Sequence, residues 1–459
     1  MKKMCLYLSL LLLITLSVDA QSLPRVDLWY STLSSDTFSV GSFRLIVGSD
    51  TLSSPIQVRH RGSYSLNFDK PTYAVKIVDE MGEKRDISLL GMRSDNYWIL
   101  DAMASDHARM RNRVSMDLWL EFSRKPWYWA EEPEMLNGYR GQMVQVFVND
   151  SAQGIYCLME RADRKQLKLK KYSAKKGVQG VLYSTYDNKD GAEYILSSKP
   201  VDTLSTWIGW EQKYPDPDDG EPICWTRLYN HILACATGST HIQDTVQRRI
   251  DWPVFVDYTL FWQLLSARDN IAKNVYLSYY NATDSRALYT PWDLDHSWGR
   301  QHNSKLEPSN TAIRYGGHKL YINLYTYASF SDTLAARYAE LRSHYFTVQH
   351  IDSLFAPYFE LYRSTGMDTV EQHIWSGHNG ITLDIPSEQS YIHRWVTERL
   401  AFLDSIYRYT PIPTGVEEHE VPSSNGLNGS NGLKGLKGWK VLSEGRIYIV
   451  RGKDVVLVR

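Results

Sequence analysis

The sequence predicts an α+β protein, because strand-like segments fill its first part and helix-like segments fill most of its second part. Short β-branched and aromatic runs separated by Ser, Gly, Asp and Pro are frequent between residues 25 and 160. Longer segments with helical character dominate beyond residue 253. Strands and helices that occupy different parts of a chain favour an α+β arrangement over regular alternation.

The first part contains strands on both sides of one helix. Strands are expected at residues 25–30, 43–47, 56–61 and 73–78, and again at 142–148 and 154–160. Between them, residues 106–122 carry Met110, Val114 and Leu118 at helical spacing, with Ser105 or Asp106 able to cap the helix start. We interpret residues 21–160 as a small, β-rich lobe.

The second part is mainly helical. After a strand at 180–186 and a loop at 214–221, helices are expected at 253–266, 331–345, 351–362 and 390–407. Residues 161–176 form a basic run, which is either a solvated face or a surface for an anionic substrate. We interpret residues 161–410 as a larger, mainly helical lobe.

The two ends of the chain differ from the rest. Residues 1–20 resemble a signal peptide, with Lys2 and Lys3 before an apolar run and Ala20 at its end, so we expect an exported protein that is periplasmic, cell-surface or secreted. No later run approaches the roughly 18 apolar residues that span a bilayer. Residues 411–438 are Gly- and Ser-rich and are expected to be a flexible linker, and 439–459 a small β-rich tail.

Composition narrows the function. The 51 basic and 52 acidic residues nearly cancel, so no nucleic-acid partner is expected. The 15 tryptophans and 31 tyrosines either fill a large core or form stacking surfaces for sugars or bases. After export three cysteines remain; Cys157 is expected to be a buried apolar side chain, and a pairing of Cys224 with Cys235 stays open.

The stretch from Asp269 to Gly299 carries the strongest chemical signal. Strands are expected at 275–280 and 286–292, joined by a turn at 281–285. Antiparallel pairing would bring Asp293 beside Asp269 and Asn274. Hard oxygen ligands gathered in this way suit a divalent metal. Histidines occur nearby, but without the spacing of a zinc site.

These residues have the order found in phosphotransferases. A kinase catalytic loop places an Asp five residues before a metal-binding Asn, and a second metal-binding Asp follows a two-strand turn. Asp269, Asn274 and Asp293 match this order. Upstream, the stretch Arg59-His-Arg-Gly-Ser can present backbone N–H groups and guanidiniums to phosphate, and Lys76 in its strand can reach an anion.

Further landmarks occur along the chain in a fixed order. They are Arg59-His-Arg-Gly-Ser, Lys70-Pro-Thr-Tyr-Ala-Val-Lys, Leu89-Leu-Gly, Met110-Arg-Asn, residues 148–156, Glu160, Asp269 with Asn274, and Pro291-Trp-Asp-Leu-Asp. With these landmarks the chain resembles the kinase-like family of spore coat protein H over residues 24–408. The resemblance implies an atypical protein-kinase-like fold with two lobes, and ATP-dependent phosphorylation of secreted or cell-surface proteins with Mg²⁺ or Mn²⁺.

The resemblance also implies roles for single residues. Asp269 matches the catalytic Asp, and Asn274 and Asp293 match the metal ligands, a role that Asp295 can share or exchange with Asp293. One departure stands beside the catalytic Asp, where Asn270 and Ile271 replace the Asp or Arg that family members often carry.

Four further residues are expected to bind the nucleotide. Lys76 matches the phosphate-binding lysine, and Arg61 belongs to the turn that faces the phosphates. Glu160 falls where the two lobes join and the base would lie. Arg111 either contacts phosphate or pairs with an acid.

The tail from residue 439 resembles the C-terminal sorting tails of Bacteroidota, on the stretch Gly-Arg-Ile-Tyr-Ile-Val-Arg-Gly at 445–452. This likeness implies the export machinery as a partner.

Two other functions stay open. One is a kinase-like surface or binding module with an inactive pocket. The other is a glycoside hydrolase, because such enzymes use two carboxyl groups and this chain combines paired acids with many aromatics.

Overall fold

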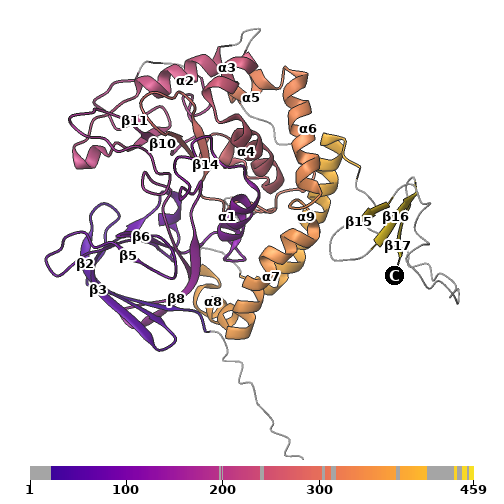
Figure 1. The fold of residues 1–459 in the computed structure, drawn as a ribbon. Helices are drawn as coiled ribbons and strands as arrows, with labels where there is room; N and C mark the ends of the chain where they lie inside the picture. The colour runs from indigo at the N-terminus through magenta and orange to yellow at the C-terminus, as the bar shows by residue number, and fades with distance from the viewer. Residues whose placement is uncertain are drawn as a thin grey trace, which may run out of the picture. The chain divides into compact units, whose positions relative to one another are not determined.

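The computed structural model describes residues 22–195, 198, 200–237, 242–301, 305–311, 317–378, 383–410, 439–441, 447–451 and 454–458. The expected signal peptide and linker lie outside these residues. The chain divides into two compact units, with the boundary between Tyr407 and Arg408. The first unit combines strands and helices, which confirms the α+β class (Figure 1).

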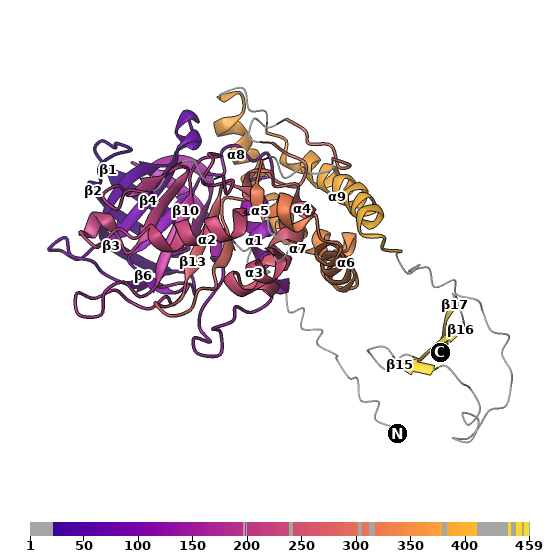
Figure 2. The ribbon, with the colours of Figure 1, turned by 90° about the horizontal axis from the view of Figure 1, so that it is seen from above.

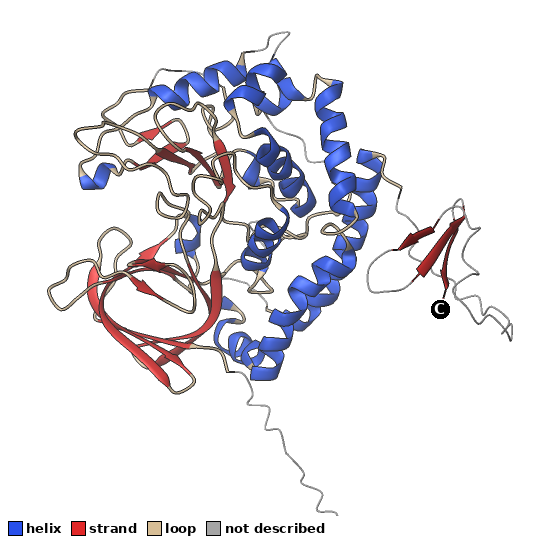
Figure 3. Cartoon of the chain, in the orientation of Figure 1, coloured by secondary structure: helices blue, strands red, loops and turns tan. Residues whose placement is uncertain are grey.

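A closed barrel of strands forms one side of the first unit (Figures 1 and 3). Its strands follow each other in the order β1-β2-β3-β4-β7-β9-β8, with antiparallel pairing except between β1 and β8. The sequence predicted six of these strands but missed β7. Their bounds are β1 Arg25–Tyr30, β2 Ser39–Val47, β3 Asp50–Arg61, β4 Thr72–Ile77, β7 Tyr97–Asp101, β8 Gly141–Val148 and β9 Ser151–Met159.

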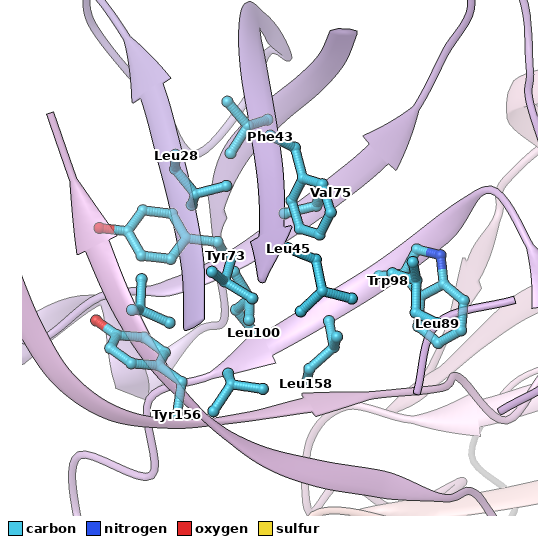
Figure 4. Close-up of a cluster of buried hydrophobic side chains, with 14 of the residues drawn as sticks. Leu28, Phe43, Leu45, Tyr73, Val75, Leu89, Trp98, Leu100, Tyr156 and Leu158 are labelled. Carbon is cyan, nitrogen blue, oxygen red and sulfur yellow. The ribbon is translucent and has the colours of Figure 1, made fainter. Parts of the chain in front are cut away.

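The inside of the barrel is an apolar core. Side chains alternate along each strand, so every second residue points inward. Tyr73, Val75, Trp98 and Leu158 are among the inward residues and are at most 1% exposed (Figure 4). Burial of such side chains stabilises the barrel by about 1.5–3 kcal/mol each.

The outer face of β3, β4 and β7 carries polar side chains in register. Arg61 lies opposite Thr72 and Lys76 lies opposite Tyr97. Since two steps along a strand span about 6.6 Å, the four steps along β4 from Thr72 to Lys76 correspond to roughly 13 Å. The outer face therefore presents successive rows of side chains, and Arg61 and Lys76 belong to different rows.

A second sheet has the order β11-β12-β10-β13-β14 and is antiparallel throughout. Its β13 and β14 form the predicted hairpin. The bounds are β10 Val181–Thr185, β11 Thr206–Trp207, β12 Trp210–Tyr214, β13 Val275–Tyr279 and β14 Leu288–Pro291. The short strands β5 Ile87–Ser88 and β6 Ser94–Asp95 form a separate pair.

Helices cover the side opposite the barrel. In both views α6 and α9 lie away from the barrel, and α1 and α4 lie between the barrel and these two helices (Figures 1 and 2). The α-helices are α1 Arg111–Phe122, α2 Thr226–Ala236, α3 Ile242–Arg249, α4 Trp252–Leu265, α5 Lys319–Leu324, α6 Ala328–Arg342, α7 Val348–Thr365, α8 Met367–Trp375 and α9 Ile385–Tyr407. The 3₁₀ helices are η1 Tyr64–Asn67, η2 Pro217–Asp219 and η3 Asp269–Ile271.

Helix α1 begins five residues later than the sequence predicts, because Asp106 organises the loop before it. The Asp106 carboxylate accepts hydrogen bonds from the backbone N–H groups of Ala108, Met110 and Arg111. It therefore satisfies the N–H groups at the helix start from outside the helix. The short helices α2, α3, α5 and α8 were not predicted.

The second unit contains a three-stranded antiparallel sheet, with β15 Trp439–Val441, β16 Ile447–Arg451 and β17 Asp454–Val458. In the first unit, Cys157, Cys224 and Cys235 are free thiols. Among the helices that the structure describes, none is both long and apolar enough to cross a bilayer.

Candidate functional site

A cleft of about 340 Å³ lies between the outer face of the barrel and the second sheet. The barrel contributes Arg59, Arg61 and Asp101, and the second sheet contributes Thr185 and Tyr276. The loops that precede β13 and follow β14, at the open end of the hairpin, line the same cleft. They contribute Asp269, Asn274, Asp293, Asp295 and His296. The structure thus brings together all four acid and amide residues that the sequence singled out.

The hairpin places Asp293 as predicted. Val275 pairs with Pro291, so the strand ends that carry Asn274 and Trp292 meet. The Asn274 side-chain amide donates to the Asp293 backbone oxygen at 3.3 Å. Asn274 and Asp293 both have positive φ angles, 57° and 55°, which Asn and Asp adopt more readily than other non-glycine residues.

Asn270, the residue beside the proposed catalytic Asp, has a structural role. Its buried side-chain amide donates to the backbone oxygens of Asn274 at 3.1 Å and Trp292 at 2.8 Å. It therefore holds the 3₁₀ turn that begins at Asp269 against the end of the hairpin. The Asp269 side chain stays 28% exposed and accessible from the cleft.

Asp101 is a further acid that the sequence did not reveal as a site residue. It ends β7, the strand that was not predicted, and faces the same cleft. The buried Asn112 donates to Asp101 at 3.0 Å and accepts from the Leu294 backbone N–H at 3.1 Å. Asn112 thus connects the barrel to the loop that carries Asp293 and Asp295. The Met110-Arg-Asn stretch was noticed in the sequence, but without a role for its Asn.

Electrostatic repulsion characterises this acidic end of the cleft. Asp293 is open to the cleft, but the surrounding walls remove part of its hydration, and this is the largest of the effects that together raise its pKa to about 7. The charges of Asp295 and Asp101 act in the same direction, whereas His296 and Arg61 oppose them. Burial also raises the pKa of Asp101.

His296 lies between two of the acids. Its Nδ1 is 3.9 Å from an Asp269 oxygen and its Nε2 is 3.4 Å from an Asp295 oxygen. Burial lowers its pKa, but the charges of Asp295, Asp293 and Asp269 outweigh this and raise the pKa to about 9. A protonated His296 therefore compensates part of the negative charge. Sequence spacing alone could not assign it to this site.

The donor chemistry of the acidic end fits a hard divalent cation. Carboxylate and amide oxygens are the groups that Mg²⁺ and Mn²⁺ prefer. Asp295 accepts from Ser105 at 2.6 Å through one oxygen, and its other oxygen, Oδ1, is buried without a hydrogen-bond partner. Within the described part of the chain, however, no three His, Cys, Asp or Glu residues are already gathered closely enough to hold a metal. Asn274, Asp293 and Asp295 are the oxygen-bearing side chains here that would hold such a cation.

The barrel side of the cleft is positively charged. Arg59 and Arg61 line it, followed by the turn of Gly62 and Ser63. Gly62 has a φ of 123°, and a Cβ there would collide with the Ser65 side chain, so this turn requires glycine. The predicted phosphate-facing turn therefore does border the acidic residues.

Lys76 lies on the same outer face but does not line the cleft. Its Nζ is 4.2 Å from the centre of the Phe38 ring and 5.6 Å from that of Tyr97. It belongs to the row of Tyr97, roughly 13 Å along the strands from the row of Arg61.

The structure does not bring Glu160 and Arg111 to the cleft. Glu160 is 1% exposed and accepts hydrogen bonds from Arg93, Arg140 and Gln166. Arg111 is fully buried and pairs with Asp106 and Glu388, each at 2.6 Å. Of the two roles considered for Arg111, pairing with acids is the one that its contacts support. Both side chains already have internal partners, so they connect parts of the fold.

Three lysines of the basic run at 161–176 form ion pairs. Lys165 contacts Asp86 and Asp95, Lys168 contacts Glu134, and Lys170 contacts Glu132. These pairs favour the solvated-face interpretation over a free anionic-substrate surface. Arg161, at the beginning of the run, lies with its guanidinium over the Tyr97 ring.

Comparison with known proteins identifies the family. A family model described as CotH kinase protein matches residues 58–403, from β3 to α9. The chain belongs to the CotH kinase protein family. It is a kinase-like protein in a family with divergent members. A search of curated proteins found no match.

Other landmarks of this CotH kinase-like protein lie away from the cleft and support its packing. Lys70 and Arg109 both contact the carboxylate of Glu371 on α8, at 2.6 and 2.7 Å. Gly154 has a φ of 78°, and a Cβ there would collide with the same carboxylate. Helix α8, which the sequence did not predict, is therefore the partner of two of the sequence landmarks.

Proposed function

We propose that the chain is an atypical protein-kinase-like phosphotransferase with a two-lobe fold. It transfers the γ-phosphate of ATP to a hydroxyl of another protein. One observation carries this proposal. A single cleft combines oxygen ligands at one end with the guanidiniums of Arg59 and Arg61 on its wall. A metal-bound polyphosphate would satisfy both charges, because phosphoryl transfer depends on positioning and on neutralising phosphate charge.

The chain's own residues would divide the work as follows. The partly exposed carboxylate of Asp269 would accept the proton of the acceptor hydroxyl. Asn274, Asp293 and Asp295 would hold Mg²⁺ or Mn²⁺, which neutralises phosphate charge when bound. Arg61, with Arg59, would orient phosphate oxygens. Asn112, Asn270 and Ser105 would fix the loops that carry these groups.

The test is transfer of labelled phosphate from ATP, with Mg²⁺ or Mn²⁺, to the chain itself and to a serine- and threonine-containing peptide library. We expect labelling by the wild type and its loss in Asp269→Ala. Asp332→Asn, which removes an exposed acid on α6, is the matched control and should retain activity.

Calorimetry with Mn²⁺ and ATP separates binding from transfer. Asp293→Asn keeps a residue that tolerates the positive φ and removes the charge, so it should weaken binding. No detectable binding by the wild type, together with unchanged behaviour of Asp293→Asn, would contradict the proposal.

A kinase-like binding module is the second candidate. Asn270, beside Asp269, is engaged in holding the hairpin through two backbone oxygens, which suits a pocket that binds without catalysis. Nucleotide binding without transfer under any of these conditions would favour this function. A glycoside hydrolase agrees less well with the site, because guanidiniums beside the acids suit anions better than neutral sugars.

We further propose an exported location and a secreted or cell-surface protein as acceptor. Residues 1–20 support export, and the tail at 439–459 supports the export machinery as a partner, both on sequence alone. Cell fractionation of the full chain and of a chain ending at residue 410 tests this. Retention of both inside the cell would contradict export, and equal export of both would contradict a role for the tail.

A further inference from the structure

A group of cations and aromatic rings lies on the outer face of the barrel beside the cleft. It consists of Phe38, Arg59, Lys76, Tyr97 and Arg161, which we call the Tyr97 cluster. The Arg161 guanidinium lies 3.7 Å from the centre of the Tyr97 ring. Lys76 and Arg59 lie 4.2 and 5.0 Å from the centre of the Phe38 ring. Two rings therefore gather three positive charges.

These charges have little internal compensation. Among the described residues, no carboxylate lies within 4.0 Å of Arg59 or Lys76, and Arg161 reaches Asp163 only at 3.4 Å. Asp163 itself is held more closely by Arg93, at 2.7 Å. The paired lysines of the following basic run show that neighbouring cations do find acids. The Tyr97 cluster is thus a local excess of positive charge.

Donor atoms in the cluster are also left without acceptors. The Nε atoms of Arg59 and Arg161 are buried and lack a hydrogen-bond partner. Buried donors are normally paired, so the two unpaired donors add to the cluster's capacity for an anionic acceptor. Burial acts to raise the pKa of Tyr97, but the combined charges of Arg161, Arg61 and Arg59 lower it.

The cluster is connected to the cleft but separate from its acidic end. Arg59 belongs to both, because it also lines the cleft. Lys76 and Tyr97 lie two rows beyond Arg61, roughly 13 Å along the strands. An anion bound there would not be the phosphate beside Asp269.

We propose that the Tyr97 cluster is an anion-binding subsite that takes a phosphate or carboxylate group. Two sources share this chemistry, a phosphate of the nucleotide and an acidic or phosphorylated side chain of an acceptor protein; the second rests on the proposed function. An extended peptide that runs from the row of Arg61 to the row of Lys76 covers this roughly 13 Å with about four residues.

Calorimetry on the full chain tests the subsite with Lys76→Gln and Arg161→Gln, each of which removes one charge. Lys319→Gln, an exposed lysine at the start of α5, is the control. The probes are inorganic pyrophosphate, ATP, and a serine peptide with phosphoserine four residues away, compared with the same peptide carrying unmodified serine there. Charge-assisted hydrogen bonds of the usual strength correspond to about tenfold in affinity each.

We expect both variants to weaken at least one anionic probe about tenfold, with no change in Lys319→Gln. Weaker ATP binding alone assigns the subsite to the nucleotide. Weaker binding of the phosphoserine peptide alone assigns it to the acceptor. Arg161→Lys keeps the charge and should retain binding, and Lys76→Gln remains informative if the Arg161 variants do not fold.

The subsite and the proposed function can fail separately. If the wild type binds ATP and transfers phosphate while both glutamine variants bind every probe as the wild type does, the subsite is refuted and the proposed function stands. If the wild type transfers no phosphate, but both variants bind pyrophosphate more weakly than the wild type does, the subsite stands without the phosphotransferase.

Discussion

Glu371 on α8 provides the sharpest test of how the barrel is held to the helices. The side chain has no solvent exposure and accepts from Lys70 Nζ at 2.6 Å, Arg109 Nε at 2.7 Å and the Ile155 backbone N–H at 2.8 Å. These three partners come from the chain before β4, the loop before α1 and strand β9. One carboxylate therefore connects three segments that are far apart in the sequence.

Replacing Glu371 by Ala leaves two buried cations without their acid. Removing one partner of a buried ion pair costs about 3–5 kcal/mol, and we expect a loss in this range at pH 7. Lys70 limits the loss, because burial already lowers its pKa to about 7, although Glu371 raises it. Without Glu371 this pKa falls further, and Lys70 then escapes part of the penalty by losing its proton.

The pH dependence follows from this proton. The folded pKa of Lys70 is below the unfolded value near 10.5, so the folded state binds fewer protons, and stability is lost as pH falls from 10.5 through the folded pKa. In Glu371→Ala that loss continues below pH 7. The free energy of unfolding should therefore differ more between the wild type and Glu371→Ala at pH 6 than at pH 8.

Urea unfolding followed by tryptophan fluorescence measures both effects. Glu360→Ala on α7 is the control, because Glu360 pairs with Arg363 in an exposed position, where such pairs contribute at most about 1 kcal/mol. A cost for Glu371→Ala no larger than that of Glu360→Ala would refute the reasoning, as would a difference that does not change between pH 6 and pH 8.

Three further outcomes are expected. Asn112→Ala removes the link between the barrel and the loop of Asp293, and we expect Mn²⁺ affinity, measured by electron paramagnetic resonance, to fall several-fold; unchanged affinity would show that the loop is held without it. The pKa of His296 is raised to about 9 in the metal-free protein, so its protonated form stabilises the fold fully below pH 6.5 and this contribution is lost as pH rises through 9. In His296→Asn, the free energy of unfolding in urea should therefore depend less on pH between 6.5 and 9. An unaltered pH dependence would count against the assignment. Burial raises the pKa values of Cys157 and Cys235 to about 12, so mass spectrometry should find neither alkylated by iodoacetamide at pH 8 until urea is added.

The hairpin and its acids could be predicted because they depend on local sequence. Two strands joined by a short turn fix their own register, and register brings Asp293 to Asn274. The barrel could not be predicted in the same way, because its closure depends on the parallel contact of β1 with β8. The short strand β7 was missed, and with it Asp101. The position of Asp101 depends on the pairing of β7 with β9, which is distant in the sequence.

Residue type alone could not separate site residues from packing residues. Arg111 and Glu160 have the chemistry of a nucleotide site, but the structure gives each buried partners instead. Buried ion pairs and catalytic clefts use the same side chains, and only the neighbours that folding supplies distinguish them. His296 is the opposite case, since it has no informative spacing in the sequence and lies between two acids of the cleft.

The near-zero net charge conceals a strong separation of charge inside one cleft. A total of −1 suggests no nucleic-acid partner, yet the hairpin acids lie at one end of the cleft and Arg59 and Arg61 lie on the barrel wall. If the acids only balanced the arginines, the two groups would pair directly, and the pKa of Asp293 would be lowered; it is raised to about 7. The cleft therefore keeps its charges apart, and a ligand that carries both a cation and anionic groups is the kind that lets both ends be satisfied together.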